Sequence, residues 1–346
     1  MGLAADGANV ITDARVLQTE FVPSEVVHRH AEVDTIAGAL EPLVDDDRPE
    51  DALLFGPTGV GKTCVARYTV SRLREQLLDL RTCYVNCWSD RTRFRVLYRL
   101  LDAIDRTVDI HRRSTPKDEL LDRLREADDH PYVAVLDEAD QLEDPSLLYD
   151  LSRLPHLTLV VVANRETDLF ASLSERTSSR LQSSTRLSFD RYGTDELVAI
   201  LERRAEQGLE PGAISDTQLR RIADAAAGDA RIAIGTLRSA ARAAERADAD
   251  AITDAMLTDA IPDARETVRQ RAIDQLTDHQ RVCYRIVAEA GEIEPGDLYE
   301  RYRERVDEPR TRRTVRDYLS KLDHYNLVRA SGEKRGRTYH AVGRSE

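Results

Sequence analysis

A glycine-rich stretch that ends in a lysine and a threonine carries the strongest chemical signal in the chain. Residues 56–63 read G-P-T-G-V-G-K-T, the spacing of a phosphate-binding loop. Glycines let backbone N–H groups turn toward phosphate oxygens, and the start of the following helix adds a favourable dipole. Lys62 is expected to reach the β- and γ-phosphates, and the Thr63 hydroxyl to ligate Mg²⁺. The loop predicts ATP or ADP with Mg²⁺ as cofactors, against the alternative of a glycine turn that binds nothing. The residues expected at the nucleotide here are Gly56, Thr58, Gly59, Val60, Gly61, Lys62, Thr63 and Cys64.

Polar side chains end two later apolar runs. The run 132–136 is followed by Asp137 and Glu138, and the run 157–163 by Asn164. Asp137 is expected near Mg²⁺, directly or through a water, and Glu138 to orient or activate the attacking water. Read alone, the pair could be a solvated strand end, but the phosphate loop upstream favours the catalytic interpretation. Asn164 could bond the γ-phosphate or the lytic water, or simply cap a loop.

Arginines supply further candidate catalytic charges. Arg176 and Arg180 precede the last apolar run of this region, and Arg231 closes the sequence G-D-A-R. An arginine supplied in trans can stabilise the charge that develops during phosphoryl transfer. In a chain so rich in arginine, a solvated surface residue is the default for any one of them. Their positions relative to the apolar runs single out these three.

The elements that must position these residues follow an alternating pattern. Between residues 51 and 190, short apolar runs alternate with helical patterns, which predicts a parallel sheet covered by helices on both faces. The fold class is therefore α/β, with a helical lid and a C-terminal winged helix beside it. The expected strands are 52–55, 82–87, 132–136, 157–163 and 185–189. The expected domains are an arm at 1–50 with a helix at 28–43, a nucleotide-binding domain at 51–190, a lid at 191–264 and a winged helix at 265–346.

The C-terminal region combines three short helical patterns with a hairpin pattern at 327–342, which is typical of a winged helix. In the helix expected at 311–325, apolar residues recur at helical spacing while basic residues share another face. Such a helix can place its apolar side on the core and its cations toward DNA. A solvated basic helix in a protein-binding winged helix is the alternative. The expected DNA contacts are Arg312, Arg313 and Arg316 on the helix, and Lys334, Arg335 and Arg337 on the wing.

Charge is distributed unevenly. The chain has 50 basic and 63 acidic residues, a net charge of −13, yet residues 309–346 hold ten basic and four acidic residues. A basic patch on an acidic protein favours nucleic acid as a partner. The acidic, lysine-poor composition suits a salt-rich cytoplasm. Four scattered cysteines favour buried thiols over a disulfide framework. Without an apolar run of membrane-spanning length or a secretory signal, a cytoplasmic, nucleoid-associated location without a membrane partner is expected.

The order of these motifs resembles the AAA+ initiators, and more closely the archaeal origin-recognition and cell-division-control initiator family. The resemblance implies that Asn164 is sensor 1 and Arg231 sensor 2, and that Arg176 or Arg180 is the arginine finger. It also implies an initiator-specific helical element between the second and third strands, where residues 90–129 carry Arg91, Arg93, Arg95 and Arg99 on one expected helix. Residues 21–29 resemble the family's N-terminal box beside the adenine. The implied nucleotide contacts outside the loop are Val22, Pro23, Arg29, Tyr192 and Arg204.

The resemblance implies a replication initiator whose ATP-bound form grips origin DNA and helps load the replicative MCM helicase together with other initiator protomers. ATP hydrolysis would be weak and act as a slow switch. Two other functions stay open from the residues: a paralogous regulator of transcription or plasmid copy number, and an AAA+ motor or signalling ATPase whose winged helix binds protein.

Overall fold

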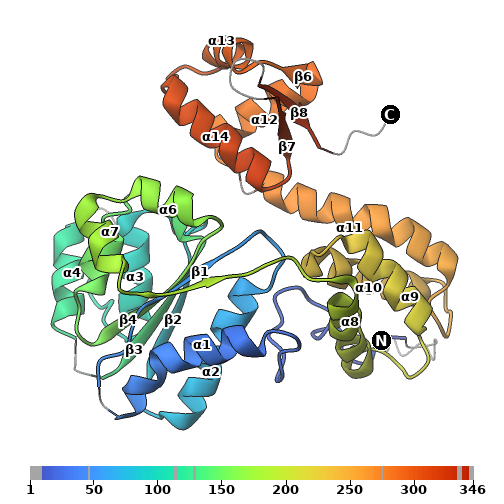
Figure 1. Ribbon diagram of the computed structural model, residues 1–346, viewed down its shortest axis with the longest axis horizontal. Coiled ribbons are helices and arrows are strands. Elements are labelled where there is room, and N and C mark those ends of the chain that lie inside the picture. The colour runs from blue at the N-terminus through green and yellow to red at the C-terminus, as the bar shows by residue number, and fades with distance from the viewer. Residues whose placement is uncertain are drawn as a thin grey trace. The chain divides into compact units, whose positions relative to one another are not determined.

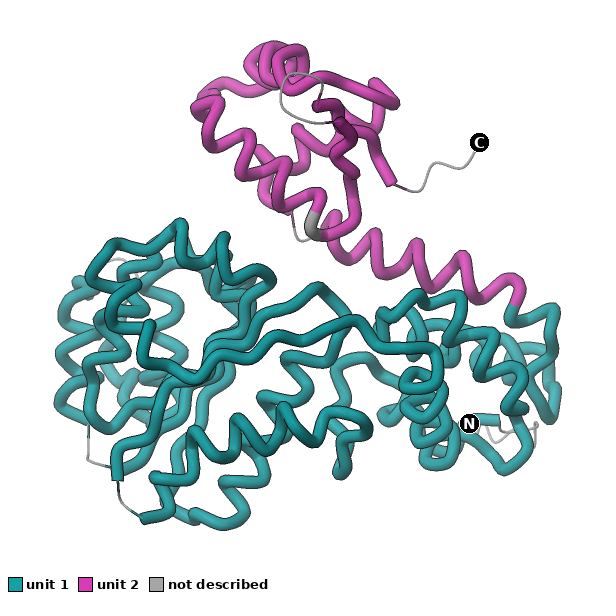
Figure 2. The backbone as a smooth tube through the Cα atoms, viewed as in Figure 1, with its two compact units in different colours: residues 1–257 teal, residues 258–346 magenta. Residues whose placement is uncertain are grey.

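The computed structural model describes residues 10–45, 47–111, 115–127, 130–274, 276–332 and 337–342. The chain divides into two compact units, residues 1–257 and 258–346, shown in separate colours in Figure 2. None of the helices in the described ranges has the length and apolar character needed to cross a membrane.

The first unit alternates strands and helices, as Figure 1 shows. Its strands are β1 (Ala52–Phe55), β2 (Arg81–Asn86), β3 (Tyr132–Asp137), β4 (Leu157–Val162) and β5 (Thr185–Ser188). Its helices begin with α1 (His30–Leu40), η1 (Glu41–Asp45), α2 (Lys62–Gln76), α3 (Arg93–Asp102), α4 (Lys117–Arg125), η2 (Ala139–Gln141), α5 (Leu147–Ser152), α6 (Glu166–Ser172) and α7 (Glu175–Leu181). The helices α8 (Thr194–Gly208), α9 (Asp216–Ala226) and α10 (Ala230–Arg246) follow, and α11 (Asp254–Asp274) leads into the second unit.

The described strands of the first unit form a parallel sheet in the order β2-β3-β4-β1-β5. Successive side chains of β1 enter different apolar clusters, with Leu53 and Phe55 on one face and Ala52 and Leu54 on the other. Helices α3, α4 and α5 contribute to the first cluster, and α1 and α2 to the second. A sheet buried on both faces explains why its strands read as continuous apolar runs. The predicted fold class is confirmed, and each expected strand matches to within one residue at either end.

The first part of the N-terminal arm, residues 10–21, is attached to the lid, whereas α1 packs against the sheet. Ile11 forms an isolated antiparallel bridge with Leu209, and the N–H groups of Thr12 and Asp13 donate to the Gly208 carbonyl at the end of α8. Leu17 is fully buried. These contacts join residues nearly 200 positions apart, so local sequence patterns could not have shown them.

The lid consists of α8, α9, α10 and the start of α11. Helix α9 begins with a capping box between Ser215 and Gln218, and the Asp229 side chain caps α10 by accepting the Arg231 and Ile232 N–H groups. Helix α11 continues past residue 264, where the sequence analysis placed the end of the lid. Residues 265–274, expected as the start of the winged helix, therefore continue a helix that begins in the lid.

The arginines near the start of α3 face carboxylates of the same unit. Asp90, only 8% exposed, accepts from Arg95 at 3.1 Å and from Arg99 at 2.9 Å. Arg93 pairs with Asp144 and Asp150, and Arg91 pairs with Glu143. The helix expected there is present, but its cations are engaged in ion pairs instead of forming an unneutralised basic face.

The thiols expected to be buried are buried in part: Cys87 and Cys283 are buried, whereas Cys64 and Cys83 are half-buried. Cys87 belongs to the cluster that contains Leu97, Cys83 packs against it, and burial raises the pKa of each of these two thiols. Within the described residues, no group of three or more His, Cys, Asp or Glu side chains is arranged to hold a metal ion.

The second unit has the arrangement of a winged helix. Its elements are α12 (Asp278–Ala290), β6 (Glu292–Ile293), α13 (Pro295–Arg305), α14 (Arg312–His324), β7 (Val328–Ser331) and β8 (Thr338–Ala341). The described strands pair in the order β6-β8-β7, with both pairings antiparallel. Val315, Leu319 and Leu322 of α14 are buried, as the helical spacing predicts. The three helices and the hairpin expected from the sequence are confirmed.

Candidate functional site

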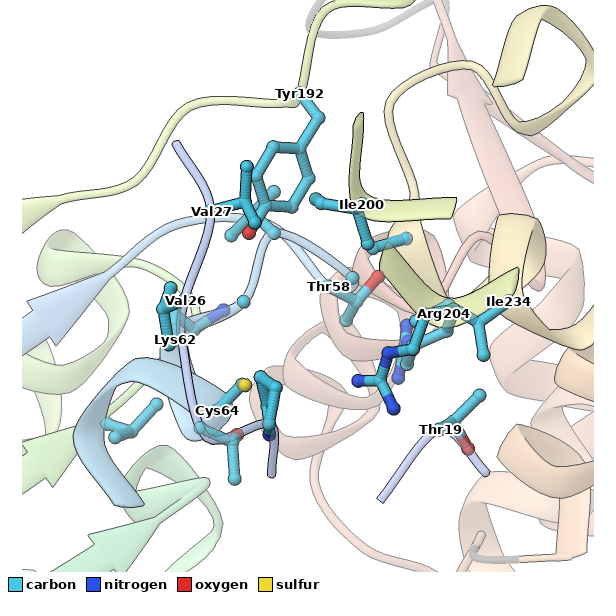
Figure 3. Close-up of a pocket in the computed structure, with 18 of the residues that line it drawn as sticks. Thr19, Val26, Val27, Thr58, Lys62, Cys64, Tyr192, Ile200, Arg204 and Ile234 are labelled. Carbon is cyan, nitrogen blue, oxygen red and sulfur yellow. The ribbon is translucent and has the colours of Figure 1, made fainter. Parts of the chain in front are cut away.

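A pocket lies where the phosphate loop, the carboxyl ends of β3 and β4, the arm and the lid meet. Figure 3 shows Thr58 and Lys62 of the loop, Tyr192 and Arg204 of the lid side, and Thr19 of the arm around it. In open parallel sheets, ligands bind at the carboxyl ends of the strands where the strand order reverses. Most of the expected site residues line this pocket: Pro23, Thr58, Gly59, Val60, Gly61, Lys62, Thr63, Cys64, Asp137, Glu138, Asn164, Tyr192, Arg204 and Arg231.

Lys62 is held inside the loop. Its Nζ donates to the carbonyls of Gly56 at 2.6 Å and Pro57 at 2.7 Å, and the residue is only 7% exposed. Burial lowers the pKa of the Lys62 ammonium to about 8. Gly56 does not line the pocket, and its contribution is the carbonyl that anchors Lys62. An ammonium fixed at the start of α2 is placed to meet a phosphate oxygen.

Hydroxyl and carboxylate oxygens meet beside Lys62. The Thr63 hydroxyl donates to Asp137 Oδ2 at 2.9 Å, and the Glu138 N–H donates to Asp137 Oδ1 at 3.0 Å. Glu138 has a φ of 54°, in the left-handed region, directly after β3. Mg²⁺ is usually held by one or two carboxylates, a hydroxyl, water and substrate phosphates rather than by a full protein cage. The donor set of Thr63 and Asp137 fits that ion.

Asn164 lies between the ends of β4 and β1. Its carbonyl accepts the Gly56 N–H at 3.1 Å, and its Nδ2 donates to Asp140 Oδ2 at 3.4 Å. The side chain is 8% exposed and lines the pocket. The backbone of Asn164 is therefore held by Gly56 and its side-chain amide by Asp140, at the wall of the pocket.

The lid touches the phosphate loop directly. The Ala230 N–H, at the start of α10, donates to the Gly59 carbonyl at 2.9 Å. A Cβ at Gly59 would lie 2.0 Å from the Asp229 carboxylate, so only glycine permits this approach. Arg231 reaches Asp229 at 3.6 Å and lines the pocket. These contacts bring the G-D-A-R sequence of the lid to the loop.

Tyr192 and Arg204 bound the pocket on the lid side. A Cβ at Gly61 would lie 2.4 Å from the Tyr192 hydroxyl. Arg204 donates to the carbonyls of Val16 at 2.5 Å and Phe21 at 3.0 Å. Arg204 thus lines the pocket and also holds the arm against α8.

Arg29 supports the pocket without lining it. Its guanidinium lies 4.3 Å from the centre of the Tyr192 ring and 5.4 Å from that of Phe189. It also donates to the Asp190 carbonyl at 2.6 Å. Val22 is likewise outside the pocket wall. Arg29 thus joins the arm to the segment that follows β5.

Arg176 and Arg180 lie away from this pocket, on α7. Arg176 is exposed, whereas Arg180 is half-buried and donates to the Ser152 carbonyl at 2.9 Å. Both line a separate surface hollow with Tyr149 and Ser179. The structure therefore does not bring them to the nucleotide site of their own chain.

Several pocket residues were not anticipated from the sequence. They include Thr19, Ile200, Arg203, Gln207 and Ile234, whereas Glu25, Val26 and Val27 belong to the box at residues 21–29 that was expected beside the adenine. Ile200, Arg203 and Gln207 recur at helical spacing on α8 together with Arg204, so one face of that helix could have been extended from the residue already singled out. Thr19 of the arm had no comparable signal.

The expected DNA-contacting residues have different surroundings within the second unit. Arg312 pairs with Glu300 at 3.0 Å and lies 5.0 Å from the Tyr299 ring. Arg313 and Arg316 are exposed on α14. Arg337 lies 5.7 Å from the Tyr339 ring, and Lys334 and Arg335 are outside the described residues.

Fold and site together define a nucleotide-binding protein of the AAA+ class with a lid and a winged helix. An AAA domain model matches residues 49–173, and a Cdc6 AAA+ ATPase-type lid domain model matches residues 198–262. The chain is 48% identical over 333 residues to ORC1-type DNA replication protein 9 of Halobacterium salinarum, covering 96% of this chain and 94% of that protein. It is 53% identical over 308 residues to ORC1-type DNA replication protein 1 of the same organism, covering 89% of this chain and 100% of that protein. The chain belongs to the ORC1-type DNA replication protein family.

A solved structure agrees with this assignment. The Aeropyrum pernix ORC1 protein in complex with DNA matches with a TM-score of 0.76 and 28% identity, over 96% of this chain and 94% of that chain. The initiator family named from the sequence motifs is confirmed. The Halobacterium relatives support a haloarchaeal source, in agreement with the salt-rich cytoplasm that the composition suits.

Proposed function

We propose that this protein is an ATP-regulated replication initiator that binds duplex DNA at an origin. The observation that carries the proposal is the hydrogen bond from the lid's Ala230 N–H to the carbonyl of Gly59 in the phosphate loop. A nucleotide in this pocket would contact the sheet domain and the lid at once. Gain or loss of a phosphate would therefore change how the two are held together, which is what a nucleotide switch requires.

The chain's own residues account for binding and for weak hydrolysis. Lys62 and the loop N–H groups would hold the phosphates of ATP or ADP, and Thr63 and Asp137 would hold Mg²⁺. Bound Mg²⁺ would neutralise charge on the phosphate oxygens. Glu138 would orient the attacking water and accept its proton, with Asn164 and Arg231 near the γ-phosphate.

An arginine from a second protomer would complete the site. Arg176 supports this role best, because it is exposed on α7 while Arg180 is tied to the Ser152 carbonyl. Arg180 would then fix α7 in place. Turnover that depends on protein concentration, and is lost in Arg176→Ala but kept in Arg180→Lys, would support this assignment.

The winged helix would supply the grip on DNA. Arg313 and Arg316 support this role, because they are exposed on the helix expected to enter the major groove. The Aeropyrum pernix ORC1 protein was solved in complex with DNA, which favours the same role here. The protein would act in the cytoplasm on the nucleoid and help load the replicative MCM helicase.

The proposal is tested by nucleotide and DNA binding in two site variants. Lys62→Ala should lose nucleotide binding, and Glu138→Gln should bind ATP but lose turnover, by about 10²–10⁴-fold if Glu138 is the general base. Glu143→Gln, an exposed carboxylate paired with Arg91, is the control. Nucleotide binding that survives in Lys62→Ala would contradict the site.

Mapping the protein's genomic positions tests the biological role. Enrichment at replication origins that requires an intact Lys62 is the expected result. Enrichment at promoters instead would favour a paralogous regulator of transcription and would contradict initiation.

A further inference from the structure

The side chain of Tyr84, on β2, is hydrogen-bonded to the Asp137 carboxylate at the end of β3. Its hydroxyl donates to Asp137 Oδ2 at 2.8 Å, the same oxygen that accepts the Thr63 hydroxyl. The other oxygen, Oδ1, accepts the Glu138 N–H. These three donors fix the plane of the Asp137 carboxylate, and Tyr84 supplies the one that comes from a neighbouring strand.

Strand register explains why Tyr84 can reach this carboxylate. Tyr84 of β2 is aligned with Val135 of β3, so Asp137 is its diagonal neighbour two residues further along. Side chains at i and i+2 of a strand share a face, and a diagonal neighbour is within reach of an aromatic side chain. A tyrosine at this position can therefore cross to the end of the next strand.

The Tyr84 ring is held by a second contact. The Arg67 guanidinium lies 5.1 Å from the centre of the ring, and Arg67 sits one helical turn after Thr63 on α2. Such a cation–π contact favours one orientation of the ring. Tyr84 is 40% exposed, so its hydroxyl is not needed to fill the core.

We infer that Tyr84 is a positioning residue for the divalent cation of the nucleotide site, an inference that rests on the proposed function. Without the phenol, the Asp137 carboxylate could rotate about its soft terminal torsion and leave the Thr63 hydroxyl. Carboxylates that hold metals are themselves held by hydrogen bonds, and loss of such a partner lowers metal affinity by about 10–100-fold. Tyr84 acts through Asp137 and does not itself reach the phosphates.

The test separates metal binding from nucleotide binding in the full-length protein. Tyr84→Phe keeps the ring and its contact with Arg67 but removes the donor to Asp137. We expect Mn²⁺ affinity in the presence of ADP, followed by electron paramagnetic resonance, to fall by about tenfold or more. ADP affinity measured in EDTA should be unchanged, because the loop and Lys62 are untouched. Tyr98→Phe is the matched control, since among the described residues its hydroxyl has no recorded hydrogen bond.

Three outcomes would overturn the inference in different ways. If Lys62→Ala abolishes ADP binding while Tyr84→Phe keeps the wild-type Mn²⁺ affinity, the role of Tyr84 is refuted and the proposed function stands. If ADP binds equally well to the wild type and to Lys62→Ala, the proposed function is refuted, and the inference about Tyr84 is refuted as well because it depends on that function. An equal loss of Mn²⁺ affinity in Tyr84→Phe and Tyr98→Phe would also refute the specific contact.

Discussion

At the scale of single residues, the burial of Lys62 sets a pH window for nucleotide binding. Its pKa of about 8 means that the nucleotide-free ammonium loses its proton well before an ordinary lysine does. We expect ATP affinity to fall as the pH rises through about 8. Lys62→Arg is the control, because a guanidinium stays charged over this range. Any affinity that this variant retains should not change with pH. Isothermal titration from neutral to alkaline pH measures both, and equal pH profiles would exclude Lys62 as the cause.

The same pKa has the opposite effect on stability. The folded-state pKa of Lys62 is lowered, so between about 8 and about 10 the unfolded chain binds a proton that the folded chain does not. The contribution of Lys62 to the free energy of unfolding therefore rises with pH across this window. Alkaline solution should stabilise the nucleotide-free fold at this residue while it weakens ATP binding.

Single residues were predictable from the sequence where the backbone dictates them. Lys62 and Thr63 follow from the loop spacing, and Asp137 from the end of a strand. The contacts of Arg29 and Arg312 could not be predicted in this way, because the partner of a long guanidinium side chain depends on tertiary packing. The hydrogen bond from Tyr84 to Asp137 could not be predicted, because it depends on the register between β2 and β3.

At the scale of elements, the contact between α10 and the phosphate loop depends on Gly59. Gly59→Ala should push Asp229 away from the loop, lowering the melting temperature and the ADP affinity. Gly212→Ala is a matched control, since Gly212 also has a positive φ, of 83°, but no atom within 4 Å of a new Cβ. Gly212→Ala should lower the free energy of unfolding by about 1–2 kcal/mol, the strain of a left-handed backbone at a residue with a Cβ, and leave ADP affinity unchanged. Adding Asp229→Ala to Gly59→Ala should restore part of the affinity, and no recovery would argue that the clash is elsewhere.

Helix α14 carries a prediction about DNA binding. Arg313→Ala with Arg316→Ala should weaken duplex binding and reduce the slope of log affinity against log salt by up to about 2, because each phosphate contact releases about one counterion. Arg285→Ala removes an exposed cation from α12 instead and should leave the slope unchanged. Fluorescence anisotropy over a range of KCl concentrations measures both. An unaltered slope in the double variant would remove this face of α14 from the interface.

Elements were easier to predict than the way they join. Strands that are buried on both faces can be recognised in the sequence as apolar runs, and capping residues such as Ser215 indicate where helices begin. The length of α11 was missed because Pro262, which usually ends a helix, lies inside it. The attachment of the arm to α8 rests on backbone hydrogen bonds between distant segments, which leave no periodic signal.

At the scale of the whole molecule, the acidic composition predicts a dependence on salt. A net charge of −13, with 63 acidic residues, gives self-repulsion that counterions reduce. The melting temperature should rise from dilute buffer to molar KCl. Thermal melts in KCl and in sucrose distinguish the two possible causes. Only KCl screens the repulsion between carboxylates, whereas sucrose stabilises proteins by its exclusion from their surface. A melting temperature that is independent of KCl would contradict a haloadapted surface.

The attachment of the arm to α8 also determines how many times the backbone passes between lid and sheet. The chain leaves the lid side after Phe21, builds the sheet, and returns after β5, so the sheet domain is in effect inserted into the lid. Arg29 ties the outgoing and returning segments together through the Asp190 carbonyl and the Tyr192 ring. Two backbone links restrict the motion of the lid relative to the sheet more than a single link would. Pro23 of the outgoing link and Tyr192 of the returning link both line the pocket, so a bound nucleotide would contact both links at once.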